Sequence, residues 1–289
     1  MTASPEVRAF FHPATWTVTY LVWDPDTRDA VIIDPVRDFD PRAVSTSWDT
    51  AERIATVIDS LGLTLHWTLE THAHADHLSG SPFFAARYGA GIAIGQAITR
   101  VQETFKGIFG LGDEVPTDGS QFDRLLADDE VLEAGSLRIH VIATPGHTPA
   151  CVSYHVGDAV FTGDALFMPD FGTGRCDFPN GSAEQLYDSV QKLYALPDDT
   201  RVFVGHDYGP GGREIAWETT IGASKRDNKQ LSATTSREEF VKFRTERDRQ
   251  LQPPNLIFQS VQVNIDAGRL PPPASNGIRY LKLPMGIFD

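Results

Sequence analysis

The segment THAHADH, residues 71–77, constrains this chain more than any other, because it places three histidines and one aspartate within six positions. It overlaps the end of HWTLETH, residues 66–72, whose composition predicts a strand. Neutral imidazole and carboxylate groups are typical ligands of zinc and iron. A cluster this dense therefore predicts a metal centre at the end of a strand.

Three further motifs follow strand-like segments: TPGH at 144–147, TGDALF at 162–167 and GHD at 205–207. Any one histidine in these motifs could be an incidental surface or capping group. Four such motifs in succession favour a metal site, because the carboxyl ends of adjacent strands converge on one edge of a sheet. The side chains expected to share this cleft are His72, His74, Asp76, His77, His147, Asp164 and His206.

The pattern along the chain predicts a mixed α/β fold. Two strand-rich halves with intervening helices indicate a sandwich with helices outside it. Helices are expected at 49–63, 77–90 and 182–196, and a charged helix at 236–251. Residues 209–228 are expected to form loop and helix, and the proline-rich tail at 270–289 to pack on the body. These patterns divide the chain into a main domain, 1–209, and an extension on it, 210–289.

The composition of the chain argues against some classes of protein. The net charge of −14 argues against a nucleic-acid partner, which would normally require a basic face. The chain contains only two cysteines, which fits a reducing compartment. It has no apolar run of the length of about 18 residues that a bilayer requires, so we expect a cytoplasmic protein without a membrane partner.

The H-x-H-x-D-H pattern of His72, His74, Asp76 and His77 resembles the defining motif of the metallo-β-lactamase superfamily, and the later ligands of that family match His147, Asp164 and His206. The resemblance covers roughly residues 7–208. It implies an α/β fold, an αββα sandwich with the metal cleft at one edge of its two sheets, here followed by a helical and proline-rich extension. The superfamily includes hydrolases and oxidative enzymes, so its fold leaves the reaction open.

The segment GDALFMPDFGTGRCDFPNGSAEQLYDSV, residues 163–190, and the motif GHDY resemble persulfide dioxygenases, and the C-terminal segment resembles bacterial β-lactamase-like hydrolases. The dioxygenase resemblance implies one Fe(II) per chain, held by His72, His147 and Asp164. It also implies that glutathione persulfide reacts with O2 to give sulfite and glutathione. The remaining members of the cluster would then form an unfilled subsite or orient the ligands: His74, Asp76, His77 and His206.

The alternative that the same ligands permit is a hydrolase with two zinc ions bridged by Asp164, acting on a thioester, as glyoxalase II does, or on a lactone. A non-enzymatic metal sensor is a further alternative, and a homodimer is left open. Tyr208 and Asp76 are the expected catalytic groups, although Tyr208 could simply pack. Arg175 could bind a glutathione carboxylate or pair with Asp177. Cys176 could carry sulfane sulfur or be structural.

Overall fold

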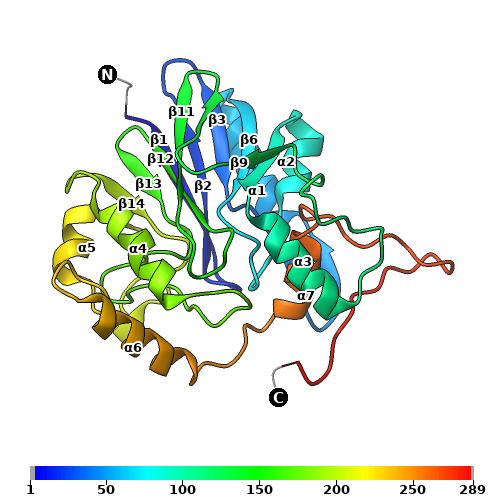
Figure 1. The fold of residues 1–289 in the computed structure, drawn as a ribbon. Helices are drawn as coiled ribbons and strands as arrows, with labels where there is room; N and C mark the ends of the chain where they lie inside the picture. Colours follow the sequence, from blue (N-terminus) through cyan, green and yellow to red (C-terminus); the bar gives the residue numbers. More distant parts are fainter. Residues whose placement is uncertain (1–3, 288–289) are drawn as a thin grey trace.

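The structure, a computed structural model, describes residues 4–287, so the first three and the last two residues of the expected ranges 1–209 and 210–289 lie outside it. Two six-stranded sheets pack face to face, and helices cover their outer faces (Figure 1). The expected αββα sandwich is confirmed.

The first sheet has the order β1-β2-β3-β6-β8-β9. Its first three strands are antiparallel, whereas β3, β6, β8 and β9 run parallel to one another. Its strands are β1 (Glu6–His12), β2 (Thr17–Trp23), β3 (Asp29–Ile33), β6 (Thr64–Glu70), β8 (Gly91–Gly95) and β9 (Arg124–Leu126).

The second sheet has the order β10-β11-β12-β13-β14-β15, in which only β13 and β14 pair in parallel. A small third sheet, β5-β4-β7, lies beside the sandwich. The remaining strands are β4 (Val36–Asp40), β5 (Ser45–Ser47), β7 (Leu78–Ser79), β10 (Val131–Ala134), β11 (Leu137–Ala143), β12 (Val152–Val156), β13 (Ala159–Phe161), β14 (Arg201–Phe203) and β15 (Glu218–Thr220).

The core between the two sheets is apolar and rich in aromatic rings. Tyr20 of the first sheet contacts Phe161 and Phe203 of the second, with ring centroids 5.2 and 5.4 Å apart. The Tyr20 hydroxyl is buried, and it donates a 2.6 Å hydrogen bond to the carbonyl of Val204. Each such ring removes about 150–250 Å² of surface from water, so this layer holds the two sheets together.

The outer faces of the sheets are covered by amphipathic helices. Helices α1 and α2 pack on the first sheet, α4 and α5 pack on the second, and α6 packs against α4. Helices α3 and α7 pack together beside β8 and the metal-motif loop. The helices are α1 (Asp49–Leu61), α2 (Ser81–Tyr88), α3 (Ile98–Phe109), α4 (Ala183–Tyr194), α5 (Ile221–Asp227), α6 (Arg237–Asp248), α7 (Ile257–Asn264) and the 3₁₀ turn η1 (Pro210–Gly212).

Two local expectations were wrong. The helix expected at 77–90 begins only at Ser81, because Leu78 and Ser79 pair with β4 and Pro82 favours the first turn of a helix. Within 209–228, β15 adds a strand to the second sheet beyond residue 209. It spans only three residues, too few for an alternating pattern to be recognised.

The proline-rich tail also differs from expectation. Residues 272–280 are exposed, and this stretch forms the arm that extends from the body in Figure 1. Three consecutive prolines, Pro271–Pro273, have no backbone N–H group to donate to the body. The chain contacts the body again at Lys282, whose backbone exchanges hydrogen bonds with the side chain of Gln262. No helix within residues 4–287 is both long and apolar enough to span a bilayer.

Candidate metal centre

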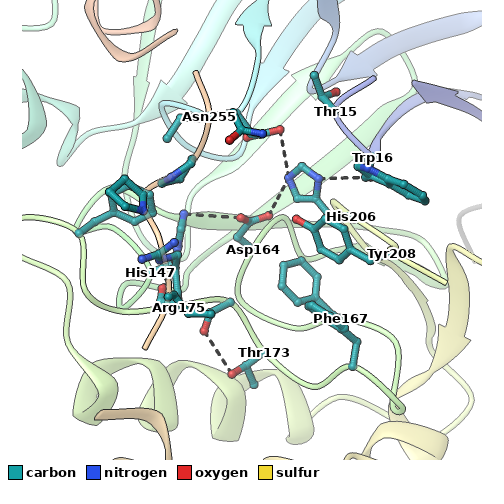
Figure 2. Close-up of a pocket in the computed structure, with 18 of the residues that line it drawn as sticks. Thr15, Trp16, His147, Asp164, Phe167, Thr173, Arg175, His206, Tyr208 and Asn255 are labelled. Carbon is teal, nitrogen blue, oxygen red and sulfur yellow. Dashed lines mark hydrogen bonds and ion pairs between the residues drawn. The ribbon is translucent and has the colours of Figure 1, made fainter. Parts of the chain in front are cut away.

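The four motifs meet at one edge of the sandwich, as the sequence predicts. His72 follows β6, His147 follows β11, Asp164 follows β13 and His206 follows β14. Figure 2 shows Asp164 lying between His147 and His206. One aspartate therefore contacts both of these histidines.

His72, His147 and Asp164 form one group of potential ligands. The Nε2 atom of His147 lies 3.5 Å from Oδ2 of Asp164, and Nε2 of His72 lies 4.0 Å from the same oxygen. Both imidazoles are buried. Two nitrogen atoms and one carboxylate oxygen thus converge from three separate loops.

Hydrogen bonds at Nδ1 leave Nε2 of both histidines available. His147 donates from Nδ1 to the carbonyl of Arg175 at 2.7 Å. The Thr71 hydroxyl donates to Asp34 at 2.8 Å, so Nδ1–H of His72 donates to the Thr71 oxygen at 3.0 Å. Partners of this kind fix the tautomer of metal-binding histidines.

Burial keeps these imidazoles neutral. It lowers the pKa of His72 well below its usual range, helped by the neighbouring histidines. Burial also lowers the pKa of His147, against the attraction of Asp164. Neutral imidazole is the form that binds metals, so the protonation state of this group suits a cation.

The unsatisfied atoms of the group fit a metal ion. His72 Nε2 and Asp164 Oδ1 are buried and have no hydrogen-bond partner within residues 4–287. Buried polar atoms normally find a partner, because an unsatisfied one costs free energy. A divalent cation would satisfy both of these acceptors, and the donor set suits iron or zinc.

A second group contains His74, Asp76 and His206. The Nε2 atom of His206 lies 3.6 Å from Asp76 and 3.4 Å from Asp164, so the two groups adjoin through Asp164. Asp76 accepts a 3.0 Å hydrogen bond from Thr17, and its pKa is lowered, since the attraction of His206, His77 and His74 outweighs burial. Asp76 therefore remains ionised.

His74 also belongs to a third group, with Asp34 and Glu70. Its Nε2 lies 3.0 Å from Oδ1 of Asp34 and 3.5 Å from Oε2 of Glu70. Burial would lower the pKa of His74, but these two carboxylates raise it well above its usual range. The three side chains are buried together, so His74 is the positive partner of two negative charges.

His77 is the member of the motif that the structure leaves apart. None of the three ligand groups formed by the described residues includes it. Its Nδ1 donates to the carbonyl of Leu78 at 3.1 Å, and burial lowers its pKa to about 3. Its Nε2 is buried and has no partner in the described part of the chain, so it remains a candidate ligand for a second ion.

Close approach of the backbone shapes the centre. A Cβ at Gly174 would collide with the carbonyl oxygen of Asp164, and a Cβ at Gly205 would lie 3.0 Å from the Asp164 carboxylate. Glycine permits this packing because it has no side chain. The loops that contain residues 174–178 and 205–207 can therefore lie directly against Asp164.

A cleft of about 410 Å³ opens onto the metal groups. Asp76, His147, Asp164 and His206 line it, and so do Arg175 and Tyr208. Its walls are largely aromatic: Trp16, Phe167, Phe171, Phe178 and Tyr208. This shape suits a substrate with a reactive group at one end and an extended remainder.

Arg175, Tyr208 and Cys176 differ in whether their side chains are available to a substrate. The Arg175 guanidinium forms two 2.6 Å hydrogen bonds to Asp177, so its planar fork is already occupied. Tyr208 stacks on His206 with an interplanar angle of 12° and is 41% exposed. Partial desolvation in the cleft and the nearby carboxylates of Asp164 and Asp76 raise the pKa of its hydroxyl, which stays protonated. Cys176 is buried, which raises the pKa of its thiol and disfavours the reactive thiolate.

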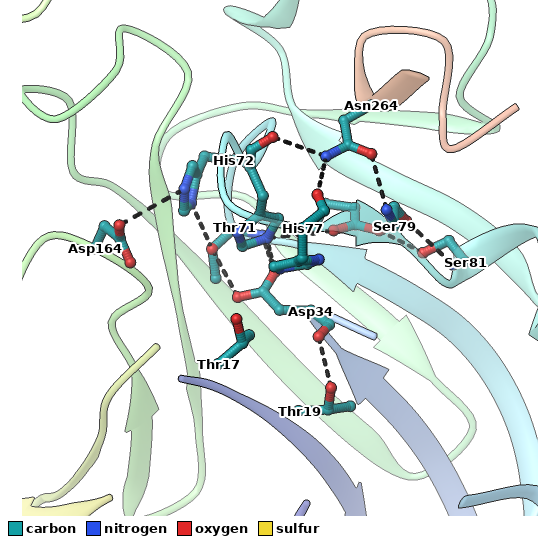
Figure 3. Close-up of polar contacts among 12 residues, drawn as sticks. Thr17, Thr19, Asp34, Thr71, His72, His77, Ser79, Ser81, Asp164 and Asn264 are labelled. Carbon is teal, nitrogen blue, oxygen red and sulfur yellow. Dashed lines mark hydrogen bonds and ion pairs between the residues drawn. The ribbon is translucent and has the colours of Figure 1, made fainter. Parts of the chain in front are cut away.

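Several residues that organise the centre carried no recognisable signal in the sequence. Asn264 of α7 donates 2.8 Å hydrogen bonds to the carbonyls of His74 and His77, and it thereby holds the motif loop (Figure 3). Asp34 accepts from the backbone and hydroxyl of Thr71. The only signal for Asp34 was its place just after a strand, which many aspartates share.

Comparisons with known proteins agree with this geometry. The family model of the metallo-β-lactamase superfamily matches residues 17–206. Glyoxylase B2 of Dictyostelium discoideum is 46% identical, covering 99% of this chain and 98% of the relative. The mitochondrial persulfide dioxygenase ETHE1 of Homo sapiens is 34% identical, covering 93% and 91% respectively.

Among solved structures, ETHE1 from Myxococcus xanthus superposes with a TM-score of 0.72 at 34% identity, covering 91% of this chain and all of that one. The resemblance noted in the sequence therefore extends over nearly the whole chain. Together with the converging histidine and aspartate side chains, it shows that the protein belongs to the metallo-β-lactamase superfamily and is a metal-dependent enzyme.

Proposed function

We propose that the protein is a glutathione persulfide dioxygenase with one Fe(II) held by His72, His147 and Asp164. The observation that carries the proposal is that His72 and His74 have different partners. His72 contributes to a group of two histidines and one carboxylate, whereas His74 is paired with Asp34 and Glu70. Such a group leaves coordination positions open for O2 and a substrate. A ferrous ion bound there would supply the redox chemistry that O2 requires.

The reaction combines glutathione persulfide, O2 and water, and it yields sulfite, glutathione and protons. The outer sulfur is oxidised and O2 is reduced. The sulfur–sulfur bond breaks, and the glutathionyl sulfur leaves with the electron pair as a thiolate that takes up a proton. The cleft suits this substrate because a sulfur group can reach the metal ligands while the tripeptide lies along the aromatic walls.

Two side chains at the cleft are suited to hydrogen bonding with a substrate. Asp76 is ionised and borders the cleft, so its carboxylate can accept a hydrogen bond; its lowered pKa makes it a weak base. Tyr208 retains its proton and can donate a hydrogen bond to the bound persulfide. We assign these roles to the two residues on their position and charge.

A dinuclear zinc hydrolase is the second candidate. It is favoured by the adjoining group of His74, Asp76 and His206, which contacts the first group through Asp164. Glyoxylase B2 is also more similar to the chain than the persulfide dioxygenase, at 46% against 34% identity. The hydrolase would use Asp164 as the bridging ligand and cleave a thioester such as S-lactoylglutathione.

Metal analysis and an oxygen electrode distinguish the two candidates. We expect protein purified without oxygen or added metal to contain about one iron per chain. It should consume O2 with glutathione persulfide but not with glutathione alone. Two tightly bound zinc ions per chain, with rapid hydrolysis of S-lactoylglutathione and no oxygen uptake, would establish the hydrolase instead.

A further inference from the structure

A small apolar cavity adjoins the metal groups, apart from the cleft. Its lining comes from the motif loop, from helices α3 and α7, and from the segments around His147 and Phe178. Ala75, His147 and Phe178 border both the cavity and the cleft, so these three side chains form the partition between them. The cavity therefore reaches a proposed metal ligand by a path that does not pass along the cleft.

The composition of the metal motif makes room for this cavity. Ala73 and Ala75 alternate with the histidines and the aspartate of the motif, and their side chains are single methyl groups. Val101 and Phe105 of α3 and Val261 of α7 continue the apolar lining, and all three are buried. The centre of a water-sized molecule can move through about 10 Å³ of the cavity, which is room for one such molecule.

The polar side chains of the lining are already engaged. The Nδ1 of His147 donates to the carbonyl of Arg175, and its Nε2 faces Asp164. The Thr148 hydroxyl accepts from a backbone N–H and contacts the Cys151 sulfur at 3.1 Å. A buried water needs about two to four polar partners, so a small apolar molecule suits this cavity better than water does.

The partition and the outer part of the lining allow a small molecule to pass. The Phe178 ring stands edge-on to the His147 ring, with centroids 4.9 Å apart. The lining also includes Pro149 and Pro179, which are partly exposed, so the cavity lies close to the surface at these residues. Small rotations of side chains, which occur within nanoseconds, are enough to admit a diatomic molecule.

We propose that this cavity binds O2 and supplies it to the metal past His147 and Phe178 while glutathione persulfide occupies the cleft. That O2 is a substrate rests on the proposed function. O2 is small, uncharged and apolar, so it is stabilised in a dry apolar cavity relative to water. A separate entrance lets O2 reach an open coordination position when the other substrate fills the cleft.

Xenon is the probe for the cavity, because it occupies dry apolar cavities and needs neither a metal nor a substrate. Crystals of the metal-loaded protein, pressurised with xenon, should show the anomalous diffraction of an atom in contact with Val101, Phe105 and Val261. Val261→Phe should fill the cavity and lose this xenon. Val261→Ile adds one methyl group and should lower the xenon occupancy, which keeps the test decisive if the larger ring prevents folding.

Val263→Ile is the matched control. It makes the same change at a buried position of the same helix, and Val263 lines neither the cavity nor the cleft. Xenon should bind to this variant as it does to unmodified protein.

Oxygen uptake at varied O2 concentration tests the supply of O2. Val261→Ile should raise the KM for O2 several-fold. It should leave the kcat at saturating O2, the KM for glutathione persulfide and the iron content unchanged, because it touches neither the cleft nor the ligands. Val263→Ile should change none of these values.

The outcomes separate the gas site from the reaction. An unchanged KM for O2 in a Val261 variant that has lost its xenon would overturn the proposal. Absence of xenon from unmodified protein would overturn it too, and the dioxygenase would still stand if that protein consumed O2 with glutathione persulfide. Bound xenon without any oxygen uptake would refute the dioxygenase, and the supply of O2 with it.

Discussion

His72 and His74 lie two residues apart in one motif, and both are 1% exposed, yet their surroundings differ. The Nε2 of His72 faces Asp164, and its pKa is lowered by burial and by the neighbouring histidines. The Nε2 of His74 faces Asp34 and Glu70, whose charges raise its pKa against the effect of burial. The comparison shows that acidic partners from elsewhere in the fold determine what each histidine of the motif can do.

The backbone explains why spacing alone could not separate them. In a strand, residues two apart point to the same face. Residues 71–77 form bends rather than a strand, so this rule does not hold there. Asp34, which follows β3 in a left-handed conformation with φ of 49°, provides the carboxylate near His74.

The largest effect is expected from removing a proposed metal ligand, compared with removing the histidine that is paired with Asp34 and Glu70. His147→Ala removes one of three proposed ligands, so metal and activity should be lost together. His74→Ala should leave the metal largely bound, with activity lowered about 10 to 100-fold, as for groups that only orient ligands. Metal content by mass spectrometry and oxygen uptake test this pair. Complete loss of metal from a folded His74→Ala protein would mean that His74 is a ligand.

Removing the carboxylate beside His74 should destabilise the fold. Asp34→Ala leaves buried charge on His74 without one of its partners, and we expect a loss of about 3 kcal/mol in the free energy of unfolding. Asp188→Ala, which breaks an exposed ion pair with Arg237, should cost less than about 1 kcal/mol. Urea unfolding of metal-free protein measures both. Equal costs would show that the buried cluster has no special role in stability.

Thr71 connects the surroundings of His72 with those of His74, because its hydroxyl donates to Asp34 and accepts from His72. Thr71→Val keeps the shape and removes the hydroxyl, so metal affinity should fall about tenfold. Thr71→Ser should restore most of it. Competition with a chelator gives both values, and an unchanged affinity in the valine variant would show that His72 is oriented without this hydrogen bond.

The smallest expected effect is on how the free energy of unfolding changes at acid pH. The pKa values of His72, His147 and His77 are lowered from 6.5 in the folded protein, so below pH 6.5 the unfolded chain binds more protons. The free energy of unfolding of metal-free protein should therefore decrease as the pH falls from 6.5 towards the folded values, near 3 for His77.

His74 contributes in the opposite sense, because its folded pKa is raised: its contribution is present below pH 6.5 and is lost as the pH rises through the folded value. His74→Gln should consequently make the acid loss steeper. Unfolding in urea at pH 7.5 and 5.5 tests this difference. A shallower slope in the variant would contradict the contrast between the two histidines.

The amino-acid sequence is sufficient to predict the sandwich and the positions of the histidine and aspartate motifs. Both are local properties: alternation and apolar spacing predict strands and helices, and the motifs stand directly after the strands that position them. The same local reasoning failed at β7 and β15, which have only two and three residues. Pairing with a neighbouring strand, rather than composition, makes these segments extended.

Which polar groups come into contact depends on the packing of the folded chain. Asp34 reaches Thr71 across 37 positions, and Asn264 reaches the carbonyl of His74 across 190. Arg247, in the extension, lies beside a cleft whose metal ligands come from the two sheets. No periodic pattern in the sequence predicts such contacts. They depend on how whole layers pack, and packing is determined by the summed burial of many apolar side chains rather than by the polar residues that it brings together.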